Sequence, residues 1–128
     1  MVKQVIVMRK DLNMRKGKIA AQASHVSMKV ILDRQITSSN EGLERVYEFT
    51  KEMGEWLDGQ FTKICVSVNS EEELDALYAK AKELNIPCAM IIDAGKTEFN
   101  GVPTKTCIAI GPATADIIDQ ITGELPLL

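Results

Sequence analysis

The chain has few of the side chains that bind metals or form cross-links. Its 128 residues include one histidine and three cysteines, and no two cysteines have the C-x-x-C spacing of a zinc or redox motif. Structural zinc takes four closely spaced Cys or His ligands, so we expect no metal site. Cys65, Cys88 and Cys107 each lie in an apolar, strand-like run, which predicts buried free thiols in a reducing compartment. None has a basic neighbour in sequence that would activate it as a nucleophile.

Long apolar runs are also absent. No stretch approaches the ~20 residues needed to span a bilayer, and Met1-Val2-Lys3-Gln4 leads directly into a strand pattern rather than a signal peptide. We therefore expect a cytoplasmic protein that does not contact membranes. The hydrophobic fraction of 45% and the charged fraction of 26% are ordinary for globular proteins, which disfavours a disordered or fibrous class. This length suits one core, and we expect a single domain over residues 1–128.

Positive charge is sparse over most of the chain but concentrated at its start. The chain carries 15 basic and 18 acidic side chains and has a net charge of −3. Residues 1–34 hold eight basic and two acidic side chains, so this segment is +6 and the remainder is −9. A basic stripe of this kind is either a contact surface for phosphates or a solvated face, and charge alone does not decide between them. The basic residues of the segment are Lys3, Arg9, Lys10, Arg15, Lys16, Lys18, Lys29 and Arg34.

Apolar patterning predicts alternating strands and helices. Strands are expected at residues 2–9, 61–68, 88–93 and 106–111. Helices are expected at residues 17–33, 41–57, 70–84 and 114–121, the third opening on the capping box of Ser70 and Glu73. The order βααβαββα predicts an α/β domain of three layers. We expect a four-stranded mixed sheet, mostly parallel with one strand reversed, and helices on both faces.

The polar segments at residues 10–18 and 93–104 follow two of the predicted strands. Ligands of open α/β sheets bind beyond the carboxyl ends of the strands, so these segments are the candidate site. Gly17-Lys18 has part of a phosphate-loop pattern, but the upstream glycine is missing and Ile19 occupies the place of the magnesium-binding hydroxyl. We therefore exclude nucleoside triphosphate hydrolysis. The free N–H groups at the start of the first helix still favour an anion.

Four polar residues fall on one face of the first predicted helix. Lys18, Gln22, His25 and Lys29 are spaced so that they lie above one another at 3.6 residues per turn. For Lys18 and Gln22, in the first turns beside the end of a strand, we prefer a functional role, and for Lys29 a solvated face. His25 either exchanges protons near neutral pH or is a hydrogen-bonded helix histidine.

Asp93 ends an apolar strand and precedes the small residues Ala94 and Gly95, which permit a sharp turn. A carboxylate in this position either caps the turn or accepts a proton from water and holds a lysine. Hydroxyl groups are available around the same loop, from Thr97, Thr104 and Thr106, although threonines leading into a strand are common.

Together these segments resemble a known family. KDLNMRKGKIAAQASH at residues 10–25, DAGKT at 93–97, CIAIGP at 107–112 and ITG at 121–123 are similar to type 2 (archaeal/eukaryotic-type) peptidyl-tRNA hydrolases, over essentially the whole chain. The resemblance implies a compact α/β domain, usually a homodimer, that cleaves the ester between a peptide and the 3′ ribose of tRNA. It implies no metal and no organic cofactor.

The resemblance assigns important positions to Lys18 and Gln22, with His25 in the same segment, and to Asp93 and Thr97. A further loop threonine of the family corresponds to Thr104 or Thr106, because the loop departs from the usual spacing. Glu98 stands where the family often has glutamine, and the tail LPLL stands where a lysine is common.

Our hypothesis is hydrolysis of peptidyl-tRNA, in which Asp93 holds the water, Lys18 and Gln22 donate to the oxyanion, and Thr97 supports Asp93. A lysine beside Asp93 would lower the carboxyl pKa, so protons would instead be moved by His25 or by substrate hydroxyls. The alternatives are an editing deacylase for aminoacyl-tRNA and a non-catalytic RNA-binding module, although the scarcity of aromatic residues argues against base stacking. The candidate catalytic residues are Lys18, Gln22, His25, Asp93 and Thr97. The candidate substrate-binding residues are Arg15, Lys16, Lys29, Lys96, Thr104 and Thr106.

Overall fold

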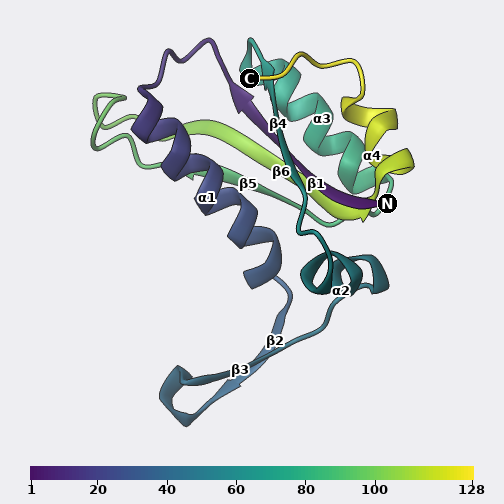
Figure 1. Cartoon of the computed structure of the whole chain (residues 1–128). Helices are drawn as coiled ribbons and strands as arrows, with labels where there is room; N and C mark the ends of the chain where they lie inside the picture. The colour runs from purple at the N-terminus through teal and green to yellow at the C-terminus, as the bar shows by residue number, and fades with distance from the viewer.

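A four-stranded sheet forms the middle of the molecule, and the computed structural model describes all residues from 1 to 128 (Figure 1). The strands are β1 (Val2–Arg9), β2 (Gln35–Ser39), β3 (Glu44–Tyr47), β4 (Lys63–Val68), β5 (Cys88–Asp93) and β6 (Thr104–Thr114). The helices are α1 (Lys16–Leu32), α2 (Lys51–Asp58), α3 (Glu71–Glu83) and α4 (Ala115–Thr122), with a short 3-10 turn, η1 (Asn40–Gly42). The order of strands in the main sheet is β4-β1-β6-β5, and β2 pairs with β3 in a separate hairpin.

The predicted mixed sheet is confirmed, but the expectation that it is mostly parallel is wrong. Only β1 and β4 pair in parallel, whereas β6 is antiparallel to both β1 and β5. One strand is indeed reversed, but it lies between two others, so two of the three pairings are antiparallel. The loop from β5 to β6 simply turns back, which an antiparallel pair allows without a crossover helix.

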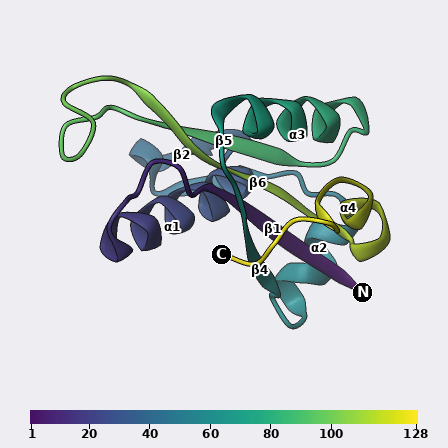
Figure 2. The same cartoon turned by 90° about the horizontal axis from the view of Figure 1, so that it is seen from above.

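Helices cover both faces of the sheet, as the three-layer prediction required. Figure 2 shows α3 and α4 on one side of the strands and α1 and α2 on the other. Successive side chains of β1 enter opposite cores because a strand alternates its faces. Val5 and Val7 pack with α3 and α4, whereas Ile6 and Met8 pack with α1 and α2. This explains why β1 reads as a continuous apolar run.

The predicted helix over residues 41–57 is wrong in its first half. Residues 35–47 form the β2–β3 hairpin instead, and its turn carries Glu41 and Gly42 at φ values of 57° and 87°. Leu43 is 87% exposed and Val46 is 49% exposed, so these apolar side chains of the first half have no core to pack against, whereas Met53 and Trp56 in the second half are buried. The helix begins only at Lys51, after Thr50, whose side chain accepts a hydrogen bond from the Met53 N–H.

The third predicted helix is confirmed, together with its cap. The Ser70 side chain accepts the Glu73 N–H at 3.1 Å, and the Glu73 carboxylate accepts the Asn69 N–H at 2.7 Å. The predicted strands and the last helix are also present, with ends shifted by a few residues. No helix in the structure is both long enough and apolar enough to cross a membrane.

All three cysteines are free thiols, as predicted. Cys107 is buried, while Cys65 and Cys88 are half-buried. Burial raises the pKa of Cys107 to about 12 and also raises the pKa of the other two. These side chains therefore stay protonated at neutral pH, which makes them poor nucleophiles.

The C-terminal residues lie along the outer edge of β4. The Ser67 N–H donates to the Pro126 carbonyl at 3.0 Å, and the Leu128 N–H donates to the Cys65 carbonyl at 3.1 Å. Leu127 completes an isolated antiparallel bridge to Val66. The tail thus continues the sheet by one short segment.

A buried polar pair joins β1 to α1. The Gln4 amide donates to the carbonyls of Ser27 and Gly111, and the Ser27 hydroxyl donates to Gln4 Oε1 at 2.6 Å. We predict that Gln4→Ala lowers the free energy of unfolding by about 3 kcal/mol, because it creates a cavity and leaves the buried Ser27 hydroxyl without a hydrogen-bond acceptor. Urea denaturation would measure this. Gln60→Ala, at an exposed site, is the control, and an equal loss in both variants would contradict the prediction.

Candidate active site

The first turn of α1 lies beside the loop between β5 and β6, at one end of the sheet (Figure 1). β1 delivers the chain to α1 and β5 delivers it to the loop, so two segments far apart in sequence meet at the edge indicated by the rule for α/β sheets. Gly95 closes the loop because it has φ +81° and accepts the Gly101 N–H at 2.8 Å. A Cβ at Gly95 would lie 2.7 Å from the Val102 nitrogen, so only glycine fits this turn.

Lys18 and Asp93 form the centre of the cluster. Lys18 Nζ lies 2.8 Å from Asp93 Oδ1 and donates to Thr97 Oγ1 at 3.0 Å. The two charged side chains are only 14% and 15% exposed. Both charges are therefore largely removed from water and depend on each other and on neighbouring hydrogen bonds.

Gln22 lies one turn further along α1 and bridges the charged pair to β6. Its Nε2 donates to Asp93 Oδ1 at 3.3 Å, and its Oε1 accepts the Thr106 hydroxyl at 2.5 Å. Gln22 and Thr106 are both buried. Thr106 thus fixes which end of the Gln22 amide faces Asp93, because an amide oxygen turned toward a carboxylate would be repelled.

A bulge in β6 aims Thr106 at α1. Ile91 pairs with Cys107 and Ile92 with Lys105, so Thr106 is the extra, unpaired residue. A bulge of this kind turns a side chain away from its regular side. As a result Thr106 reaches the Gln22 side chain while Cys107, next in sequence, contacts the Gln22 carbonyl at 3.5 Å.

Hydrogen bonds hold the pKa of Asp93 below its ordinary value. The largest cause is the hydrogen bond from Lys18, and the Gly95 N–H, which donates to Asp93 Oδ2 at 2.8 Å, acts in the same direction. The attraction of the Lys18 charge and the Gln22 bond add to it, while partial desolvation opposes it. Asp93 is therefore a carboxylate over the whole neutral range.

The structure brings together five of the residues that the sequence analysis singled out, namely Lys18, Gln22, Asp93, Thr97 and Thr106. His25 is exposed two turns beyond Lys18, about 10 Å along the helix axis, and does not touch this cluster. Lys29 pairs with Asp33 at 3.1 Å, and the Thr104 hydroxyl donates to the Val102 carbonyl. The side chains of Arg15, Lys16 and Lys96 are exposed near the cluster at the start of α1 and in the loop.

Sequence reasoning missed Phe99. Its ring lies 5.7 Å from Lys18 Nζ and is half-buried against the core between α1 and the sheet. A ring face at this distance attracts an ammonium group. The only available signal was an aromatic residue within a polar loop.

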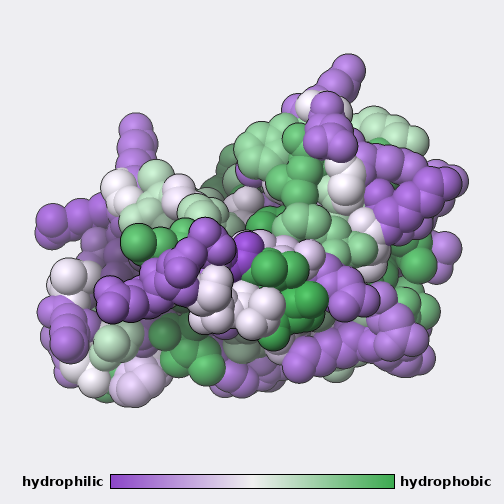
Figure 3. Space-filling model, turned by 90° about the horizontal axis from the view of Figure 1, so that it is seen from below, coloured by the Kyte–Doolittle hydropathy of each residue, from purple (hydrophilic) through white to green (hydrophobic).

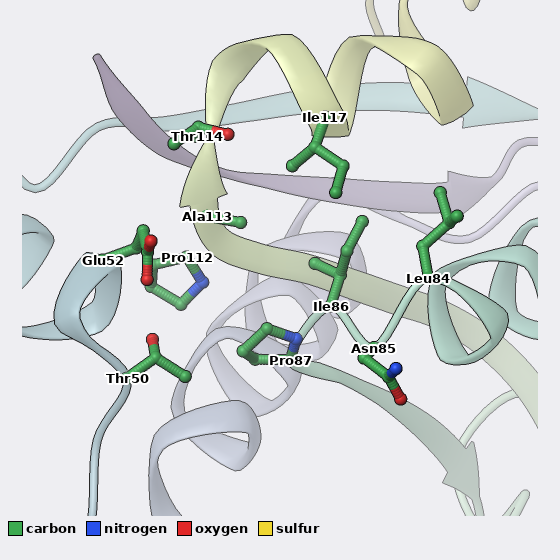
Figure 4. Close-up of a pocket in the computed structure, with 10 residues that line it drawn as sticks. All are labelled: Thr50, Glu52, Leu84, Asn85, Ile86, Pro87, Pro112, Ala113, Thr114 and Ile117. Atoms are coloured by element: carbon green, nitrogen blue, oxygen red, sulfur yellow. The ribbon is translucent and has the colours of Figure 1, made fainter.

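The site is open rather than enclosed. None of the molecule's cavities is lined by Lys18 or Asp93. The cavity of Figure 4 lies at the other end of the sheet, between Thr50 before α2, Pro87 before β5 and Pro112 in β6. The underside of the molecule mixes apolar and hydrophilic side chains (Figure 3). No three His, Cys, Asp or Glu side chains lie together in an arrangement that could hold a metal ion.

A lysine, a carboxylate, an amide and hydroxyls gathered at the open rim of an α/β sheet are the groups of an enzyme that acts on polar bonds. The family model of peptidyl-tRNA hydrolase PTH2 matches residues 2–128, and the chain belongs to this family. The predicted family and enzyme class are therefore confirmed.

Relatives match over their full length. A peptidyl-tRNA hydrolase of Sulfurisphaera tokodaii is 46% identical over 126 residues, which cover 98% of each chain. Those of Saccharolobus solfataricus and Saccharolobus islandicus are 41% identical over 128 residues, which cover 100% of each chain.

The lowered pKa of Asp93 predicts how stability depends on pH. A carboxyl group whose folded pKa is depressed contributes stability that is fully present above its unfolded pKa of about 4. That contribution is lost as pH falls through the lower folded pKa. We expect the free energy of unfolding to fall more steeply below about pH 4 in the wild type than in Asp93→Asn.

Urea denaturation between pH 7 and pH 2 would measure both slopes. Asp58→Asn is the control, because Asp58 is exposed and forms no ion pair. Parallel curves for the wild type and Asp93→Asn would contradict the assignment.

Proposed function

We propose that this chain hydrolyses the ester of peptidyl-tRNA at the cluster of Lys18, Gln22, Asp93, Thr97 and Thr106. The observation that carries the proposal is the contact between Lys18 and Asp93, which are 75 positions apart and meet at the rim of the sheet. Membership of the peptidyl-tRNA hydrolase family supplies the reaction. The open shape of the site suits a substrate as large as tRNA, which supplies much of the enclosing surface itself.

Lys18 is the donor to the developing oxyanion. An ammonium group has three N–H donors. Two of them are taken by Asp93 and Thr97, at 2.8 Å and 3.0 Å. The third is free to meet the carbonyl oxygen of the ester, where negative charge grows as water attacks.

Asp93 positions groups more than it removes protons. Its lowered pKa makes it a weak base, so its main work is to hold Lys18 and to accept a hydrogen bond from the attacking water. The water oxygen bonds to the carbonyl carbon and passes a proton to a neighbouring water, the bond to the ribose 3′ oxygen breaks, and that oxygen takes up a proton. His25 lies too far away to deliver it directly, which leaves water and the neighbouring ribose hydroxyl as carriers.

The exposed cations Arg15, Lys16 and Lys96 are the contacts for tRNA phosphates in this proposal. None of them forms an ion pair within the chain, unlike Lys29. Binding should therefore weaken as salt rises, because phosphate contacts release counterions. In this proposal Thr104 stabilises the loop, because its hydroxyl donates a hydrogen bond to the Val102 carbonyl. That the chain is a homodimer is a prediction from the family resemblance, and that it works in the cytoplasm is a prediction from its hydropathy and N-terminal pattern.

We predict that Lys18→Ala and Asp93→Ala each lower kcat by about 10²-fold to 10³-fold. Melting temperatures should fall by several degrees, because each variant leaves a shielded charge without its partner, but both variants should still be folded at the assay temperature. Lys51→Ala, at an exposed lysine on α2, is the matched control. Near-wild-type rates in both site variants would refute the site.

The choice of substrate separates this function from its alternatives. We expect the purified chain to release N-blocked aminoacyl residues from tRNA and to leave free aminoacyl-tRNA intact. Cleavage of the free form alone would indicate an editing deacylase. Binding of tRNA without turnover of either form would indicate an RNA-binding module.

A further inference from the structure

Arg9, the last residue of β1, belongs to the basic segment of the chain, but its charge faces inward. Its side chain is only 11% exposed. Nε and Nη2 donate to the two oxygens of Asp11, at 3.2 Å and 2.7 Å. Nη1 donates to the Lys105 carbonyl at 3.0 Å. All three guanidinium nitrogens are therefore engaged within the chain.

The contact with Lys105 falls where regular pairing of β6 stops. Backbone pairing between β1 and β6 ends at Met8 and Cys107. On the other side of β6, the bulge at Thr106 interrupts the pairing with β5. The Arg9 side chain continues the tie between β1 and β6 one step beyond the last backbone pair. It thereby holds the residue that precedes the bulge.

Lys105 is connected to the candidate active site through the backbone and two hydrogen bonds. Lys105 precedes Thr106, whose hydroxyl donates to Gln22 Oε1. That bond leaves Gln22 Nε2 facing Asp93 Oδ1, at 3.3 Å. If the bulge relaxed, Thr106 would return toward the regular strand, and the Gln22 amide would keep only its bond to Asp93.

Asp11 gives Arg9 a second attachment, on the segment that enters α1. The paired contacts from Nε and Nη2 hold the guanidinium plane in one orientation, which a single contact would not do. Through Asp11 and Lys105, Arg9 therefore joins the two segments that carry Lys18 and Thr106.

We propose that Arg9 is a positioning residue for the hydrolytic site, acting through Lys105 and Thr106 on the Gln22 amide, and that it does not bind phosphate. The proposal rests on the proposed function, since Gln22 matters for the reaction only if the cluster is the active site. A lysine would keep the positive charge at this position. A single ammonium group cannot reproduce the planar fork that reaches both Asp11 and Lys105.

The test compares Arg9→Lys with Arg9→Gln in steady-state cleavage of N-blocked aminoacyl-tRNA at several salt concentrations. We expect both variants to lower kcat by about 10-fold or more, since small misplacements of reacting groups slow catalysis strongly. KM and its salt dependence should stay within about 2-fold of the wild type, because no phosphate contact is lost. Arg15→Gln is the opposite case, for which KM should rise and its salt dependence should flatten.

Arg45→Lys is the matched control, at an exposed arginine of the hairpin, and should behave as the wild type in every measurement. Wild-type activity of Arg9→Lys together with a raised KM in Arg9→Gln would assign phosphate binding to Arg9 and overturn the proposal. An unchanged kcat in both variants, together with a lower melting temperature, would show that Arg9 only stabilises the fold. That result would also overturn the proposal.

A second readout does not depend on activity. The side-chain amide ¹H–¹⁵N signals of Gln22 should shift in Arg9→Lys relative to the wild type, because the Thr106 hydroxyl would no longer hold the Gln22 Oε1 in its present position. Unchanged Gln22 amide signals would overturn the proposal. Absence of cleavage by the wild type would instead count against the proposed function alone.

Discussion

The contact between the Lys18 ammonium and the Asp93 carboxylate is the interaction on which the site depends. Both side chains are mostly shielded from water, so each would be a costly isolated charge without the other. Such a pair is stable only when its remaining donors and acceptors are also satisfied. Gln22, Thr97 and Gly95 meet that need from the helix and from the loop. The cluster therefore holds α1 and the loop after β5 in one arrangement.

The central position of β6 lets this one strand contact two other strands and both layers of helices. It pairs with β1 on one side and β5 on the other, and it packs against helices of both layers. Its pairing with β5 is interrupted at Thr106, at the end nearest the cluster, and its pairing with β1 is interrupted at the other end, between Ile110 and Ala113. Regular pairing from Cys107 to Ile110 confines the irregular backbone to the two ends of the strand.

The sequence predicted which polar side chains lie together better than it predicted the direction of the strands. Helical spacing placed Lys18 and Gln22 on one face, and the end of an apolar run located Asp93. Strand direction is not encoded in an apolar run, so the sheet was wrongly expected to be mostly parallel. Which of Thr104 and Thr106 reaches α1 depends on a bulge, which leaves no mark in the residue pattern. The inward charge of Arg9 was hidden for the same reason, because its partner Lys105 is remote in sequence and offers only a backbone carbonyl.

The tail along β4 has a consequence for how the protein meets other chains. An open strand edge offers free N–H and C=O groups to which a foreign strand can add, and natural proteins shield such edges. Pro126 and Leu128 occupy these groups on β4. The outer side of β5 is then the remaining uncovered edge of the main sheet. Self-association by strand addition to this sheet, of the kind that leads to aggregates, is confined to that one side.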